Sequence, residues 1–112
     1  MAKFYKNAFY DPTTTAATTV YTSPSNANAI IQNIQLTNEG GSKTVKVAVH
    51  DSSTSTNYQV AYASITGPTI CNVAKGPIIL EENDYVTIET SDTSAISGTL
   101  GILEISREDQ NG

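Results

Sequence analysis

The histidine His50 stands beside Asp51, and such a pair can supply a general base together with its orienting carboxylate. The chain has no second histidine to complete a zinc site, and its one cysteine, Cys71, falls in a different predicted strand. Serine and threonine are abundant, but none occupies a Gly-x-Ser-x-Gly turn, so no nucleophile with a base can be assigned. We therefore expect no catalytic residues and no enzyme. We interpret His50 as a partly exposed residue at a strand end that bonds the turn after it.

A second group with possible chemistry is Glu81-Glu82-Asn83-Asp84, whose carboxylate and amide oxygens are ligands that Ca²⁺ accepts. The group lacks the Asp-x-Asp-x-Asp-Gly loop and its closing Glu. The neighbours Leu80 and Tyr85 instead indicate a tight turn between two strands, with Asn83-Asp84 taking the less common backbone angles. Gly40-Gly41 fits a hairpin, since no Lys-Ser/Thr follows as in a phosphate-binding loop. The sequence predicts no metal site and no cofactor.

Charge and composition exclude several classes of partner. The formal net charge is −5, and Lys3 and Lys6 are too few to form the basic face that nucleic-acid binding requires. The N-terminus lacks the apolar stretch of a signal peptide, and no segment has the length of a transmembrane helix. We therefore expect no nucleic acid, no membrane, and folding in a reducing cytoplasm. A single Cys71 allows no intramolecular disulfide, and we expect it to be buried and inert.

The elements that must hold these residues are short β-type runs separated by turn residues. Such spacing predicts an all-β fold, an antiparallel sandwich of about eight short strands, with a jelly roll favoured over an immunoglobulin-like order. The runs are residues 29–37, 44–50, 58–65, 69–73, 77–80, 85–90 and 98–105.

Alternation along these runs predicts which side chains face the core. Val45, Val47 and Val49 share one face, and the same pattern predicts that Ile30, Ile34 and Leu36 share one face. The last run changes phase: Leu100 and Ile102 share one face, whereas Leu103 and Ile105 share the other. Either apolar residues on both faces or a β-bulge near Gly101 would explain this change.

The chain is divided into an extended N-terminal arm (1–19), a β-sandwich domain (20–106) and a flexible C-terminal tail (107–112). Aromatic residues crowd the start of the arm, and a threonine-rich run follows Asp11-Pro12. Two interpretations stay open: a first strand lying on its own sheet, or an arm that docks on a neighbouring subunit. The threonine-rich spacer favours docking, with aromatic rings as the partner-binding anchors. These anchors are Phe4, Tyr5, Phe9 and Tyr10.

Three segments of the sandwich domain carry a resemblance to a known family. Residues 20–24 read Val-Tyr-Thr-Ser-Pro, residues 29–38 read Ala-Ile-Ile-Gln-Asn-Ile-Gln-Leu-Thr-Asn, and residues 76–84 read Gly-Pro-Ile-Ile-Leu-Glu-Glu-Asn-Asp. Together they resemble a widespread group of small virion proteins of tailed phages, over about residues 20–105. The chain departs at Asn83, where that group commonly has glycine; both residues tolerate positive φ. With its two ends, the chain looks most like versions from contractile-tailed phages of marine cyanobacteria.

The resemblance implies a non-enzymatic structural protein of the virion, assembled in the host cytoplasm. The first expectation is a capsid decoration protein that binds and stabilises the major capsid protein shell, as a homo-oligomer with a trimer favoured. One alternative is a tail, neck or baseplate accessory protein. Another is a receptor- or glycan-binding module with Tyr58 and Tyr62 as its platform, flanked by Asn57 and Gln59. The spacing puts both rings on one face, which core packing also explains.

Overall fold

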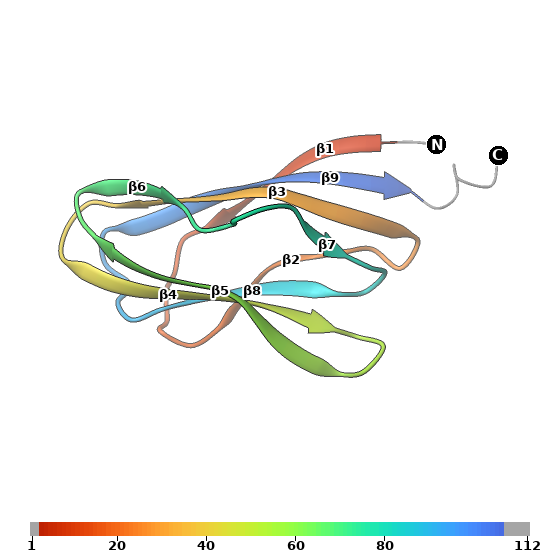
Figure 1. The fold of residues 1–112 in the computed structure, drawn as a ribbon, viewed down its shortest axis with the longest axis horizontal. Helices are drawn as coiled ribbons and strands as arrows, with labels where there is room; N and C mark the ends of the chain where they lie inside the picture. Colours follow the sequence, from red (N-terminus) through yellow and green to blue (C-terminus); the bar gives the residue numbers. More distant parts are fainter. Residues whose placement is uncertain (1–2, 107–112) are drawn as a thin grey trace.

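The computed structural model describes residues 3–106, which form nine β-strands and no helix; the predicted tail 107–112 lies outside the described residues. Every strand pairing is antiparallel. The strands, in chain order, are β1 Lys3–Tyr10, β2 Thr18–Thr22, β3 Ala27–Asn38, β4 Ser42–Asp51, β5 Thr56–Thr66, β6 Thr69–Asn72, β7 Ile78–Leu80, β8 Tyr85–Thr90 and β9 Ile96–Ser106 (Figure 1).

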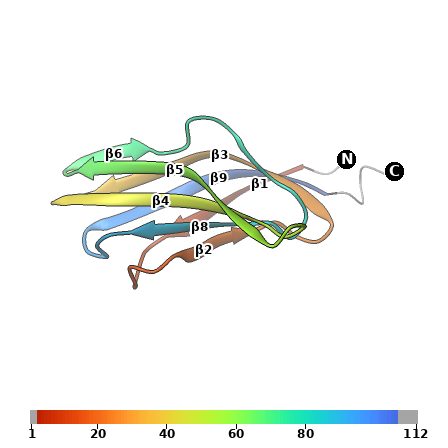
Figure 2. The same cartoon turned by 60° about the horizontal axis from the view of Figure 1, so that its bottom comes forward.

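Two sheets pack face to face in the order of a jelly roll. Sheet A runs β1-β9-β3-β6, with β7 also paired to β3, and sheet B runs β2-β8-β4-β5 (Figure 2). The short β6 and β7 both pair with β3 on the side away from β9, so together they fill the place of one strand. The eight strand positions then follow the jelly-roll winding, and the predicted fold class is confirmed.

The core lies between the sheets and consists mainly of aliphatic side chains from alternate strand positions, joined by Tyr10 and by Val73 and Ala74 of the loop after β6. The valines follow the predicted alternation, since Val45 and Val47 are buried and Val49 packs against the same core. The core cluster comprises Tyr10, Ala29, Ile31, Ile34, Leu36, Val45, Val47, Ile65, Val73, Ala74, Leu80, Val86, Ile88, Ile96, Leu100 and Ile102. These β-branched and aliphatic residues suit a pleated surface with one buried face.

A β-bulge in β3 changes the predicted faces of that strand. The register with β9 shifts between Ile31 and Asn33, so one extra residue, Gln32, stands in β3. The side chains of β3 before the bulge therefore point to the face of the sheet opposite to the one that regular alternation predicts. Ile31 and Ile34 are buried, whereas Ile30 points outward, and the prediction that Ile30 shares a face with Ile34 was wrong.

The N-terminal aromatic segment is the edge strand β1. Lys3 to Tyr10 pair residue by residue with β9, from Lys3 opposite Ile105 to Tyr10 opposite Gly98. The segment is therefore a strand on its own sheet, which is the first of the two interpretations, and it is not an extended arm. The physical reason is that β1 completes the ladder on the open side of β9 and places Tyr10 in the core. The expected boundary at residue 19 falls inside β2.

The gap between β6 and β7 is closed by a side chain. Asn72 Oδ1 accepts hydrogen bonds from the backbone N–H groups of Ile34 (3.0 Å) and Ala74 (3.2 Å). The N–H of Val73 donates to the Ile34 carbonyl oxygen at 3.0 Å. The backbone of β3 therefore stays hydrogen-bonded where the ladder stops.

Candidate protein-binding surface

His50 and Asp51 do not form a catalytic pair, because their bonds go in different directions. His50 Nδ1 lies 2.5 Å from Asn57 Oδ1, and its ring stacks on Tyr85 with centroids 4.5 Å apart. The Asp51 carboxylate accepts bonds from Ser53 N (3.1 Å) and Ser53 Oγ (2.7 Å), and the side-chain bond is the main cause of its lowered pKa. The histidine thus bonds the strand after the turn, in line with the structural role predicted for it.

The acidic segment is the predicted turn. The N–H of Asp84 donates to the Glu81 carbonyl oxygen at 3.1 Å, and Asn83 adopts a φ of 69°. The buried Asp84 carboxylate accepts bonds from Glu81 N (3.0 Å), Ser52 N (3.0 Å) and Ser52 Oγ (3.1 Å). Its oxygens therefore hold this turn against the β4–β5 loop. Over residues 3–106, no group of three or more His, Cys, Asp or Glu side chains is placed to hold a metal ion.

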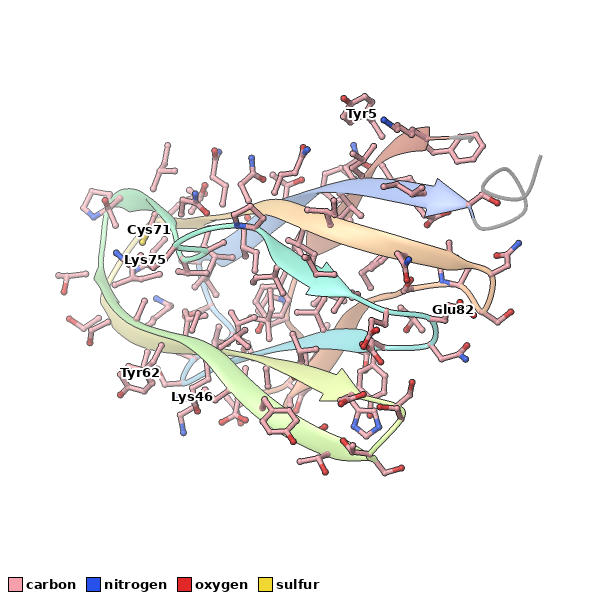
Figure 3. All side chains as sticks on the ribbon, turned by 45° about the vertical axis from the view of Figure 1, so that its right-hand side comes forward. Tyr5, Lys46, Tyr62, Cys71, Lys75 and Glu82 are labelled. Atoms are coloured by element: carbon pink, nitrogen blue, oxygen red, sulfur yellow. The ribbon has the colours of Figure 1, made fainter. Side chains whose placement is uncertain are left out.

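Tyr58 and Tyr62 do not form a platform. A bulge in β5 shifts the register between Val47 and Ala48 of β4, so Tyr58 pairs with Val49 while Tyr62 pairs with Lys46. Cross-strand partners share a face, and Val49 faces the core. Tyr62 instead lies beside Lys46 on the outer face of sheet B (Figure 3). The prediction that both rings share one face was wrong, because the bulge reverses the alternation.

The four predicted anchors divide into exposed and buried rings. Tyr5 and Phe9 point outward from sheet A and are 81% and 72% exposed, and Phe4 is half exposed on the opposite side of β1. Tyr10 is buried, and its hydroxyl lies 3.2 Å from Thr90 Oγ1 on sheet B. Burial raises the pKa of Tyr10. Tyr10 therefore links the two sheets and leaves three of the four rings accessible to a partner.

Tyr5 begins a continuous row of large apolar side chains across sheet A. It pairs with Leu103, Leu103 pairs with Ile30, and Ile30 pairs with Ile79. All four side chains point outward, because Ile102, Ile31 and Leu80 beside them in the chain are buried. Ile79 is 66% exposed, and Figure 3 shows Tyr5 projecting away from the sandwich on the side opposite Tyr62. We call Tyr5, Leu103, Ile30 and Ile79 the apolar row.

Sequence reasoning found one member of the apolar row, Tyr5, and missed three. Leu103 was noted as a change of phase in the last run, and the structure explains it by apolar residues on both faces of β9. Ile79 was hidden inside the short apolar run Ile78-Ile79-Leu80, and Ile30 was assigned inward. Among the three residues that were missed, Leu103 alone had a signal in the sequence, the change of phase in its run, which indicated an apolar outer face.

The outer faces of the two sheets differ in charge. Among the described strand residues that point outward from sheet A, Lys3 carries the one charge. Sheet B presents Lys46 and Glu89 as paired neighbours on its outer face, with polar residues around them. Depletion of charge together with exposed aromatic and aliphatic side chains is typical of the core of a protein interface. The outer face of sheet A is therefore the candidate protein-binding surface.

Besides Asp84, two further charged side chains are buried, Glu104 and Lys43, and they lie at opposite ends of the core. Glu104 in β9 accepts a 2.5 Å hydrogen bond from the Tyr21 hydroxyl of sheet B and forms a 3.2 Å ion pair with Lys6. Burial, and then the bond to Glu104, raise the pKa of Tyr21. At the opposite end, Lys43 Nζ donates to Asn38 Oδ1 at 3.0 Å and to the Gly40 carbonyl oxygen. Each charge has partners, so neither is an orphaned group that points to a ligand.

Comparisons with known proteins place the chain in no family. No family model and no curated protein matches the chain. Among solved structures, it is similar to a chain in the structure of the infectious bursal disease virus Gx strain, at 10% sequence identity and a TM-score of 0.40. The match covers 92% of this chain and 30% of that chain, so this chain spans less than a third of the other. Within residues 3–106, no helix is long and apolar enough to span a membrane.

Proposed function

We propose that the protein is a structural component of a phage virion, most specifically a decoration protein that binds and stabilises the capsid shell without catalysis. The observation that carries the proposal is the charge-poor outer face of sheet A with its apolar row. Such a surface suits association with protein subunits, since few charged groups must lose their water on contact.

The position of the phage-like motifs supports a structural role. The segment 20–24 contains the end of β2, residues 29–38 lie within β3, and residues 76–84 contain β7 and the Glu81–Asp84 turn. These segments therefore define strands and turns of the sandwich. A family defined by such features is a family of building blocks, and fold alone assigns no activity.

The mechanism is added interface area. A stable contact between proteins buries roughly 1,600 Å² in total, and repetition over a symmetric shell multiplies it. Tyr5 and Phe9 are the aromatic anchors of this contact, because large exposed rings contribute most to interface energies. Self-association of the chain and contact with the shell both belong to this mechanism.

Electron cryomicroscopy of purified virions tests the proposal, with the chain tagged after its last residue, Gly112. Density at regular lattice points over the head is the expected result. Label confined to the neck, tail or baseplate would replace decoration with an accessory role there. Absence from the particle would overturn the virion assignment. A Tyr5→Lys variant should lose occupancy, whereas Tyr62→Lys, on the outer face of sheet B, should keep it.

A further inference from the structure

We propose that the outer face of sheet A binds the same face of a second copy of this chain, forming a two-fold symmetric dimer. The inference rests on the proposed function, since it names the partner of that protein-binding surface. It commits to one occupant, a second copy, and to a dimer in place of the trimer expected from the family resemblance.

The first argument is that the apolar row matches itself. A two-fold axis that lies between the two faces and parallel to the row brings each row residue opposite its own copy. Tyr5 then meets Tyr5, Leu103 meets Leu103 and Ile79 meets Ile79. Isologous contacts of this kind are the usual basis of homodimers, and sheets packed face to face interdigitate side chains about 10 Å apart.

The second argument is that the rows on either side bring no like charges together. Ile105 lies two positions beyond Leu103 along β9, and Gly101 lies two positions before it. The same axis places Ile105 of one copy over Gly101 of the other, which is covered by the neighbouring Asn33 amide and by no charged group. Lys3, which pairs with Ile105, then faces Asn7, which pairs with Gly101. The one outward charge of sheet A among the described residues therefore meets an amide and not a second lysine.

The third argument combines area and charge. The four strand positions of sheet A hold 8 residues in β1, 11 in β9, 12 in β3 and 7 in β6 and β7 together, so the face covers about 600 Å². A standard interface needs about 800 Å² from each partner, so the strands of this face supply about three quarters of the required size. Each copy carries a net charge of −5, and no described outward residue of sheet A is acidic. Approach by this face therefore brings the two copies together with the least repulsion.

The mass of the full chain in solution tests the inference. Analytical ultracentrifugation over a range of concentrations should give twice the mass of one chain. The double variant Tyr5→Lys/Ile79→Lys should raise the dissociation constant of the dimer at least 100-fold, because it places four lysines in one apolar interface. Both side chains are exposed, so circular dichroism should show an unchanged fold. The matched control is Tyr62→Lys, an exposed tyrosine on the outer face of sheet B, which should leave the dimer intact.

Cross-linking tests the symmetry. In a Cys71→Ser background, Tyr5→Cys lies on the proposed axis and should be joined into dimers by a short bismaleimide. Asn7→Cys lies off the axis and should be joined far less. A single-chain mass at every concentration, or a trimer, would overturn the inference. If the chain alone is monomeric but Tyr5→Lys abolishes binding to virions, the face belongs to the shell; that result overturns the dimer and leaves the proposed function standing.

Discussion

Glu104 and Lys43 are buried at opposite ends of the core, and their charges are satisfied in different ways. Glu104 is held by Tyr21 from the other sheet and by Lys6 from its own sheet. Lys43 is held by neutral oxygens of Asn38 and Gly40, which are five and three residues away in the β3–β4 hairpin. The Tyr21–Glu104 bond joins residues 83 positions apart. The Glu104 end therefore fixes how the two sheets meet, whereas the Lys43 end fixes a local hairpin.

The largest effect is expected when the long-range bond is removed. Tyr21→Phe leaves a buried carboxylate without its hydroxyl donor, and the free energy of unfolding should fall by about 2 kcal/mol. Urea unfolding measures it. Tyr10→Phe, which breaks the other bond between the sheets, is the matched control. It should cost about 1 kcal/mol, because Tyr10 and Thr90 are both neutral. Equal losses of unfolding free energy in the two variants would show that the charge of Glu104 does not strengthen its hydrogen bond with Tyr21.

Alkaline pH should weaken the Glu104 end selectively. An unfolded tyrosine ionises near its ordinary pKa of about 10, whereas burial and Glu104 raise the pKa of Tyr21 in the folded protein. The stabilisation is fully present below pH about 10 and is lost as the pH rises towards the raised value, because the unfolded state releases its proton first. Unfolding free energies between pH 8 and 11 should fall steeply in the wild type and less steeply in Tyr21→Phe. Parallel profiles would contradict this account.

The smallest effect is expected at the Lys43 end. Lys43→Met keeps the length of the side chain and removes the ammonium group. The hydration that this group loses on burial offsets most of the free energy gained from its hydrogen bonds. The hairpin keeps the bond from Gly40 N to Asn38 Oδ1. The free energy of unfolding should therefore change by less than about 1 kcal/mol. Lys46→Met, on the exposed outer face of sheet B, is the control for the loss of one positive charge. A loss of about 2 kcal/mol or more at Lys43 alone would mean that both ends depend equally on their charge.

Regular elements could be predicted from the sequence, because their signals are local. Alternating valines predicted β4, and Asn83 between two apolar runs predicted the turn before β8. The inward position of Glu104 could not be predicted, since a carboxylate there is stabilised by Tyr21 from a distant part of the chain. Its presence among leucines and isoleucines made β9 look irregular.

The candidate surface was harder to predict than the fold. Single-residue bulges at Gln32 and Val60 have no distinctive residue type, yet each reverses the facing of every residue beyond it. One bulge turned Ile30 outward into the apolar row, and the other separated Tyr58 from Tyr62. Sequence alternation alone therefore assigned Ile30 to the core and proposed a tyrosine platform that the structure does not form.

The break between β6 and β7 limits how this molecule can polymerise. A strand from another molecule that approached that edge of sheet A would meet the four residues of β6. It would then meet the Asn72 side chain and a loop, and after them the three residues of β7. Fibril growth needs an uninterrupted row of free backbone groups. At high protein concentration, this edge of sheet A therefore gives no template for a growing fibre.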